Sequence, residues 1–583
     1  MTFLEDPTRF LFFTGKGGVG KTSLACATAV QLADSGKRVL LVSTDPASNI
    51  GQVFGQPIGN TITALTSVPG VDALEIDPEQ AAEEYRERIV GPVRGLLPDR
   101  EIAAITEQLS GSCTTEIASF NEFTSLLADP ALVAGYDHII FDTAPTGHTI
   151  RLLKLPGDWT GFLNKGEGDA SCLGPLSGLE KQRDLYARAV QVLTDPSATR
   201  LVLVARAQSS SLDEVARTSD ELRQAGIQAT HLVVNGVLPE GATVGDPLAA
   251  AIYARESDAM ASPRAALDGL QSDVVTLKPD NMVGVENLRT LLNEAPASAS
   301  DTTRTPMPVP TASLRALVDQ IWADGHGLVM CMGKGGVGKT TIAAAIASEL
   351  ASRGGDVHLT TTDPAAHLSG AIGDRGGQTN LEVSRIDPQQ AVLAYREHVM
   401  ATKGKDLDDA GRALLAEDLL SPCTEEVAVF QQFSHLVNQA RRRFVIMDTA
   451  PTGHTLLLMD AAGAYHREIA RNMQDGLNFV TPLMRLQDPG HTKVVLVTLP
   501  ETTPVMEATV LQQDLERAGI RPWAWVVNQS LSAAGVSSPL LRQRAALEQA
   551  PLAAVQQQTS RIAVVPLMAR EPVGLSALAQ LAS

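Results

Sequence analysis

Residues 10–23 read FLFFTGKGGVGKTS, and residues 328–341 read LVMCMGKGGVGKTT. Each stretch passes from an apolar strand through a glycine-rich turn into a helix, and each contains the phosphate-binding pattern G-x-x-x-x-G-K-[ST]. Glycines let the backbone wrap closely around phosphate oxygens, and the N–H groups of the turn and of the helix N-terminus stabilise the anion. The two stretches therefore predict two nucleotide-binding sites in one chain.

Four further stretches recur in the same order along the chain. They pair STDPAS at 43–48 with TTDPAA at 361–366, SCTTEIASF at 112–120 with PCTEEVAVF at 422–430, FDTAPTGHT at 141–149 with MDTAPTGHT at 447–455, and HLVVNGVL at 231–238 with AWVVNQSL at 524–531. Matches that keep their order indicate an internal duplication of one domain.

The boundary between the two copies is suggested by composition. Residues 293–311, NEAPASASDTTRTPMPVPT, are rich in Pro, Ser and Thr and poor in large hydrophobic residues, which is typical of an exposed linker. We therefore expect a first P-loop domain at 1–292, a linker at 293–311 and a second P-loop domain at 312–583.

Both halves alternate continuous apolar segments with segments of helical spacing. RVLLVSTD at 38–45 and FVIMDTA at 444–450 are expected to be buried strands, whereas TSLACATAVQLADSG at 22–36 has helical spacing and ends at a glycine. This alternation predicts the α/β class, with two tandem P-loop domains that each have a mostly parallel sheet and helices on both faces.

Composition narrows the possible partners and the compartment. The net charge of −19 disfavours binding to phosphate backbones, so no nucleic-acid partner is expected. No run of about 18 apolar residues occurs, so we expect no segment that spans a membrane. The five cysteines show no CxxC spacing, which favours free thiols in a reducing cytoplasm.

The phosphate-binding turns assign chemical roles to individual side chains. Lys21 and Lys339 are expected to contact the β- and γ-phosphates of ATP, and Thr22 and Thr340 are expected to hold Mg²⁺ through their hydroxyls. The other residues expected to line the phosphates are Gly15, Gly17, Gly18, Val19, Gly20, Ser23, Gly333, Gly335, Gly336, Val337, Gly338 and Thr341.

Two pairs of carboxylates follow apolar strands. Asp45 and Asp363 each lie 24 residues after the phosphate-loop lysine (45 − 21 and 363 − 339), where a carboxylate can orient the attacking water. The alternative for each is a cap of the turn before the proline that follows. Asp142 and Asp448 match the Walker B position, where a carboxylate is expected to bind Mg²⁺ through water.

Asn235 and Asn528 end late strands of the two halves. An amide side chain offers both a donor and an acceptor, which suits an adenine edge. A structural role in a turn is nearly as plausible from the sequence alone, so both interpretations stay open here.

The turn GKGGVGKT contains a second lysine, at Lys16 and Lys334. This deviant Walker A form resembles the family of P-loop ATPases that includes the nitrogenase iron protein, the partition ATPases, the tail-anchored-protein targeting ATPase and the arsenite-pump ATPase. In that family, the extra lysine contacts the nucleotide of the partner subunit. The resemblance implies that Lys16 serves the second site and Lys334 the first, across a pseudo-twofold interface within one chain, and that both lysines take part in catalysis. The role of Asn235 and Asn528 at adenine is implied in the same way.

The repeated DTAPTGHT places His148 and His454 six residues after the Walker B aspartates, and CTTE or CTEE precedes it. This combination closely resembles the arsenite-pump ATPase family over essentially the whole chain. The resemblance implies an ATPase stimulated by arsenite or antimonite, which acts as the soluble catalytic subunit of a membrane arsenite permease. It further implies an arsenic metallochaperone as a possible partner and a cytoplasmic location, peripheral to the inner membrane.

The cysteines suggest where As(III) or Sb(III) binds. Cys26 and Cys331 lie in apolar segments and are expected to be small buried residues. Cys113 and Cys423 lie just before a helix, which lowers a thiol pKa, and soft thiolates favour thiophilic ions. The resemblance implies a metalloid site whose ligands are Cys113, Cys172, Cys423, His148, His454 and Ser421.

A mechanism follows as a hypothesis. A metalloid that bridges Cys113 and Cys423 draws the halves together, which brings each second lysine to the opposite phosphates and aligns the attacking water. The alternatives are a targeting factor for tail-anchored proteins, a non-hydrolysing scaffold that senses metalloid or nucleotide, and an iron–sulfur ATPase. The targeting factors typically carry a CxxC zinc clasp, which this chain lacks.

Overall fold

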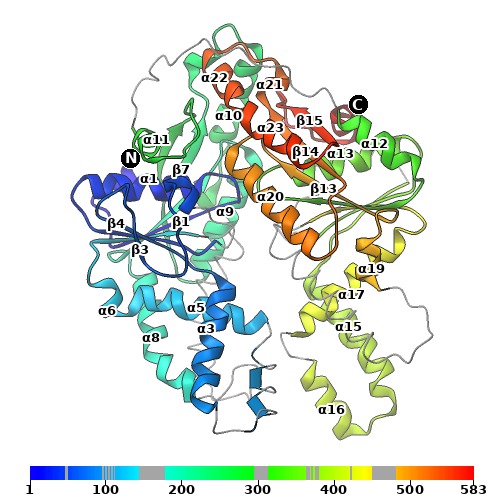
Figure 1. The fold of residues 1–583 in the computed structure, drawn as a ribbon, viewed down its shortest axis with the longest axis horizontal. Helices are drawn as coiled ribbons and strands as arrows, with labels where there is room; N and C mark the ends of the chain where they lie inside the picture. Colours follow the sequence, from blue (N-terminus) through cyan, green and yellow to red (C-terminus); the bar gives the residue numbers. More distant parts are fainter. Residues whose placement is uncertain are drawn as a thin grey trace. The chain divides into compact units, whose positions relative to one another are not determined.

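A computed structural model describes residues 1–45, 50–94, 98, 101–102, 105–106, 109, 112–143, 177–293, 313–362, 368, 372–373, 380–419, 423–449 and 481–582. The chain divides into two compact units (Figure 1), Met1–Thr302 with Ser538–Leu540 and Thr303–Ser537 with Leu541–Ser583. Apart from Asn293, the linker predicted at 293–311 lies outside the described residues, so its exposure stays a prediction.

The first unit is built on an eight-stranded sheet with the order β3-β4-β2-β5-β1-β6-β7-β8. All neighbours are parallel except the antiparallel pair β3–β4. The strands are β1 (Phe10–Thr14), β2 (Val39–Ser43), β3 (Thr63–Ala64), β4 (Val71–Glu75), β5 (His138–Asp142), β6 (Thr199–Ala205), β7 (Ala229–Val237) and β8 (Gln271–Thr276).

Helices cover both faces of this sheet because alternate residues of β1 enter different apolar cores. Leu11 and Phe13 join one core with α1 and α11, whereas Phe10 and Phe12 join another with α5, α8 and α9. The helices of the first unit are α1 (Lys21–Asp34), α2 (Ile50–Phe54), α3 (Pro78–Val90), α5 (Ser112–Ala128), α6 (Pro130–Val133), α8 (Ser177–Thr194), α9 (Ser209–Gln224), α10 (Pro247–Ala261) and α11 (Val285–Leu291).

The second unit repeats the architecture with a seven-stranded, parallel sheet of order β11-β10-β12-β9-β13-β14-β15. In both units the strand that leads into the phosphate-binding turn, β1 or β9, lies inside the sheet. The strands are β9 (Gly327–Met332), β10 (Val357–Thr361), β11 (Leu381–Val383), β12 (Phe444–Asp448), β13 (Thr492–Thr498), β14 (Ala524–Ser530) and β15 (Ile562–Pro566).

The second sheet is also covered on both faces, since Val329 and Cys331 join a core with α12, α13 and α24, and Leu328 and Met330 join one with α17, α20 and α23. The predicted α/β architecture is thus confirmed. The helices are α12 (Leu314–Ala323), α13 (Lys339–Ser352), α15 (Pro388–Thr402), α16 (Asp409–Asp418), α17 (Cys423–Gln439), α19 (Pro482–Gln487), α20 (Thr502–Arg517), α21 (Leu531–Ala534), α22 (Pro539–Leu547), α23 (Gln549–Gln558) and α24 (Leu575–Leu581).

Short 3₁₀ helices complete the described elements: η1 (Thr2–Leu4), η2 (Gly91–Val93), η3 (Glu240–Thr243), η4 (Ala265–Leu267) and η5 (Gly404–Asp406). Within the part of the chain that the structure describes, no helix combines the length and the apolar character needed to cross a membrane.

Candidate nucleotide and metalloid sites

The glycine turn of the first unit is held tightly against the strands beside it. A Cβ on Gly15 would lie 2.1 Å from the carbonyl oxygen of Val204, at the end of β6. Gly20 has φ +93°, and a Cβ there would lie 2.2 Å from Nδ2 of Asn235. Only glycine fits these two positions, so the turn forms a cradle lined by backbone, as phosphate binding requires.

The second unit reproduces this cradle. A Cβ on Gly333 would lie 2.2 Å from the carbonyl oxygen of Val497, and one on Gly338, with φ +91°, would lie 2.2 Å from Nδ2 of Asn528. Both turns therefore have the backbone shape that suits a nucleotide phosphate.

The phosphate-loop lysines are buried in these cradles. Nζ of Lys21 donates to the carbonyl oxygen of Lys16 at 3.1 Å, and Nζ of Lys339 donates to that of Lys334 at 2.9 Å. A buried ammonium that is directed along the turn lies where it can contact a bound phosphate. This position agrees with the role that the sequence suggests, which stays a prediction.

A hydroxyl and a carboxylate meet at the base of each turn. Thr22 Oγ1 donates to Oδ2 of Asp142 at 2.6 Å, and Thr340 Oγ1 donates to Oδ2 of Asp448 at 2.8 Å. Both aspartates are buried at the ends of β5 and β12, and both bring oxygen ligands, which are the kind that Mg²⁺ prefers. The residues present thus fit an Mg²⁺ ion beside the phosphates.

Asp45 lies at the same edge of the first sheet as Asp142. It follows β2, whose last residue, Ser43, is paired in register with Asp142. The backbone N–H of Asp45 donates to Oγ of Ser43 at 3.2 Å, which fixes the start of the turn. This location is compatible with contact to an attacking water. Asp363, the matching residue of the second unit, lies outside the described residues.

The two asparagines hold the phosphate-binding turns. Nδ2 of Asn235 donates to the carbonyl oxygen of Val19 at 2.8 Å, and Nδ2 of Asn528 donates to that of Val337 at 3.0 Å. The structure therefore gives these side chains a supporting role that the sequence analysis did not specify. The hydrogen bond to the turn uses only part of the bonding capacity of each amide, so both side chains could also contact adenine. That contact stays a prediction.

The second lysine of each turn forms an ion pair inside its own unit. Nζ of Lys16 lies 3.2 Å from Oε2 of Glu214, and Nζ of Lys334 is paired with Oε1 of Glu507. Sequence analysis missed both glutamates. A signal was available, because each is the sixth residue of its helix, α9 or α20, and these helices follow matching strands.

The buried cysteines are confirmed as parts of the core. Cys26 and Cys331 are completely buried, and burial raises the pKa of both thiols well above the usual range. The carboxylates of Asp142 and Asp448, respectively, add to this increase in pKa. Because a thiolate is disfavoured at both positions, neither is suited to bind a metalloid.

The structure places two of the three expected metalloid cysteines at helix N-termini. Cys113 is the second residue of α5 and Cys423 is the first residue of α17, so each helix begins slightly earlier than predicted and includes the cysteine in its first turn. The other expected ligands, Cys172, His148, His454 and Ser421, lie outside the described residues. Within the described ranges, no group of three or more His, Cys, Asp or Glu side chains is arranged to hold a metal ion.

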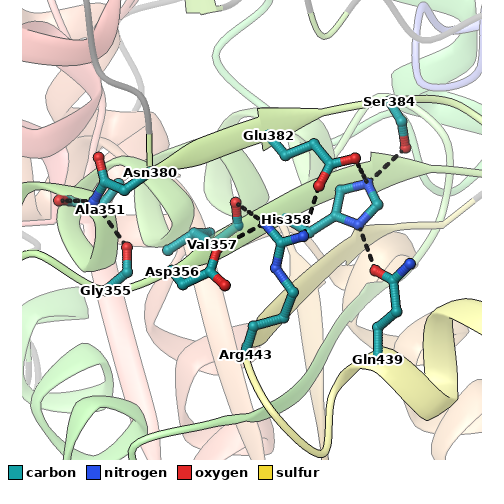
Figure 2. A network of polar contacts seen from close by, with 10 residues as sticks. All are labelled: Ala351, Gly355, Asp356, Val357, His358, Asn380, Glu382, Ser384, Gln439 and Arg443. Atoms are coloured by element: carbon teal, nitrogen blue, oxygen red, sulfur yellow. Dashed lines mark hydrogen bonds and ion pairs between the residues drawn. The ribbon is translucent and has the colours of Figure 1, made fainter.

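The second unit contains a polar network that sequence analysis did not predict (Figure 2). His358, buried on β10, places Nδ1 2.9 Å from Oε1 of Gln439 and Nε2 2.8 Å from Oγ of Ser384. Nη1 of Arg443 donates to Oε2 of Glu382 at 2.6 Å.

His358 also lines a cavity of about 410 Å³ together with Tyr395, His398 and His435. In the first unit, the position equivalent to His358 is Leu40, a core residue.

Comparison with known proteins covers the whole chain. A family model described as "Anion-transporting ATPase" matches residues 8–294, 326–487 and 464–583. Two Escherichia coli proteins named arsenical pump-driving ATPase are 61% and 60% identical to the chain, and each match covers 100% of both proteins. The "ATPase GET3" of Malassezia globosa is 34% identical, but that match covers 40% of this chain and 74% of the relative.

Proposed function

Because the chain belongs to the anion-transporting ATPase family and is therefore an ATPase, we propose that it drives the extrusion of arsenical anions through a separate membrane pump. Its full-length relatives at 59–61% identity are named arsenical pump-driving ATPases, which supports this function. The observation that carries the proposal is the presence of two complete phosphate cradles, each with a buried lysine and a threonine–aspartate pair.

The proposed roles of the nucleotide residues follow from their positions. Lys21 and Lys339 bind the β- and γ-phosphates, and Thr22 and Asp142 in the first unit hold Mg²⁺, as Thr340 and Asp448 do in the second. Mg²⁺ supplies positive charge that offsets the charge developing on the transferred phosphate. In the first unit, Asp45 orients the attacking water, and Asp363 does so in the second.

The proposal includes a metalloid site. The As(III) or Sb(III) bound there is both the activator of ATP hydrolysis and the ion that is transported. Its ligands are Cys113, Cys172, Cys423, His148, His454 and Ser421. Support comes from the helix N-termini at Cys113 and Cys423, since a helix N-terminus lowers a thiol pKa and favours the thiolate that binds soft ions.

Activation is proposed to work through closure of the two halves. A metalloid bound by cysteines of both halves favours a closed arrangement in which Lys16 and Lys334 contact the phosphates of the opposite site. The energy of ATP hydrolysis then passes to a membrane arsenite permease, and an arsenic metallochaperone delivers the ion. This is allosteric coupling between two distinct sites, with an expected magnitude of about 5-fold to 150-fold.

The test is steady-state ATP hydrolysis by the purified chain with Mg²⁺, with and without antimonite or arsenite. We expect stimulation of about fivefold or more in the wild type. Cys113→Ser and Cys423→Ser should abolish it without weakening nucleotide binding, whereas the matched control Cys26→Ala should keep it. Hydrolysis that never responds to metalloid, together with binding of a hydrophobic helix, would contradict the proposal and favour a targeting function.

A further inference from the structure

The ion pair of the second lysine occurs in both units at matching positions. In the first unit, the side chain of Lys16 is 38% exposed, whereas that of its partner, Glu214, is 9% exposed. In the second unit the corresponding values are 23% for Lys334 and 10% for Glu507. Each pair therefore joins a more exposed lysine to a nearly buried carboxylate.

The carboxylate is the fixed member of each pair. Glu214 lies on α9 between Leu212 and Val215, whose side chains are buried in the core of the first unit. Glu507 lies on α20 between Val505 and Ala508, which are buried in the core of the second unit. A helix anchored on both sides of the glutamate holds its carboxylate in place, so the flexible lysine is the group that can move.

We propose that Glu214 and Glu507 are positioning residues that hold Lys16 and Lys334 inside their own units and thereby limit hydrolysis of ATP in the absence of metalloid. This inference rests on the proposed function, in which each lysine contacts the phosphates of the opposite site. An ammonium paired with a carboxylate of its own unit gives up or weakens that contact when it binds a phosphate elsewhere.

The competition has a defined energetic effect. The closed state is stabilised only by the difference in free energy between the new lysine–phosphate contact and the lysine–glutamate contact that is lost. Because the carboxylates are nearly buried, solvent and salt screen these pairs less than they screen surface pairs. Replacing the carboxylate by an amide of the same shape removes the charge that retains the lysine and should shift the population toward closure.

The experiment uses the full chain with Glu214→Gln, Glu507→Gln and the double substitution. Hydrolysis of Mg–ATP is measured without metalloid, and the affinities for a non-hydrolysable ATP analogue and for ADP are measured separately. We expect the double variant to raise the basal rate about threefold to tenfold and to lower the ratio of stimulated to basal rate. The Kd of the ATP analogue should fall while that of ADP stays constant, because only the triphosphate supplies a γ-phosphate.

Matched controls lie on the same two helices. Asp220→Asn and Asp514→Asn remove carboxylates that pair with the exposed side chains of Arg223 and Arg517 and are themselves 43% and 23% exposed. These controls should leave the basal rate unchanged. Glu214→Asp and Glu507→Asp keep the charge but shorten the side chain, so they should give intermediate rates, and thermal unfolding checks that every variant is folded.

The outcomes separate this inference from the proposed function. A basal rate that is unchanged or lower in the folded double variant, or an equal change in affinity for ADP and the ATP analogue, would overturn the inference. A wild type that hydrolyses ATP but does not respond to metalloid would contradict the proposed activation, while the comparison of basal rates would still decide whether the glutamates restrain the lysines.

Discussion

Asn235 lies so close to Gly20 that a Cβ on the glycine would be 2.2 Å from Nδ2 of the asparagine. The same amide nitrogen donates to the carbonyl oxygen of Val19. The end of β7 thus determines the shape of a turn that lies 216 residues earlier in the chain. The identical relationship between Asn528 and Gly338 shows that this support is part of the duplicated unit.

Gly20→Ala should therefore weaken ATP binding by about tenfold or more, because the methyl group displaces Asn235 and distorts the cradle. The matched control is Gly36→Ala. Gly36 also has a positive φ, +86°, but nothing lies within 4 Å of its Cβ position. The control should lose only about 1 kcal/mol of stability. Titration with a fluorescent ATP analogue and thermal unfolding distinguish the two effects, and equal losses of affinity would contradict the role of the close contact.

Asn235→Ala distinguishes support of the turn from recognition of the base. If the hydrogen bond to Val19 is the main contribution, the affinities for ATP and GTP should fall by the same factor, about fivefold to tenfold. Competition of the two nucleotides against a fluorescent analogue measures this factor. A loss confined to ATP would instead establish the contact with adenine that the resemblance implies.

Asp142→Asn should raise the Mg²⁺ concentration required for half-maximal hydrolysis by about tenfold or more, because the amide can still accept from Thr22 but carries no charge for the ion. Asp448→Asn tests the second site in the same way. Titration of hydrolysis with Mg²⁺ in each variant shows which site turns over. If neither variant changes the Mg²⁺ requirement, these aspartates do not hold the ion.

The five cysteines should separate into two classes toward a thiol reagent at neutral pH. Burial raises the pKa of Cys26 and Cys331, so both the thiolate fraction and the access of the reagent are low. The native protein should take up at most three labels, and all five cysteines should react after unfolding. Intact mass and peptide mapping measure this, and a label on Cys331 in the native protein would show that its unit opens readily.

Much of the fold could be predicted from local pattern. The apolar runs of the sequence correspond to β1, β2, β5, β6 and β7 in the first unit and to β9, β10, β12, β13 and β14 in the second. Helix α1 ends at Asp34, just before the positive φ of Gly36, as predicted. The search for continuous apolar runs missed β8, because its residues alternate between buried and exposed. Strand β15 is apolar throughout and could have been predicted by the same criterion.

The nucleotide sites were partly predictable for the same reason. Turns, lysines and strand-end aspartates follow from motifs of adjacent residues. Glu507 lies 173 residues from its partner, Lys334, so no motif of adjacent residues joins them, and the signal lay only in the matching positions of Glu214 and Glu507 in the two copies. The network around His358 was missed because a histidine in an apolar strand gives no indication of its partners, which come from other elements.

His358 and its counterpart Leu40 also bear on how such a chain can evolve. In a homodimer, one gene specifies both subunits, so every substitution appears twice and must be tolerated in both places. Here each half has its own codons within one reading frame, and a buried imidazole can replace a core leucine on one side alone. The fusion therefore permits the halves to specialise, and a phenotype caused by a mutation in one half need not be reproduced by the equivalent mutation in the other.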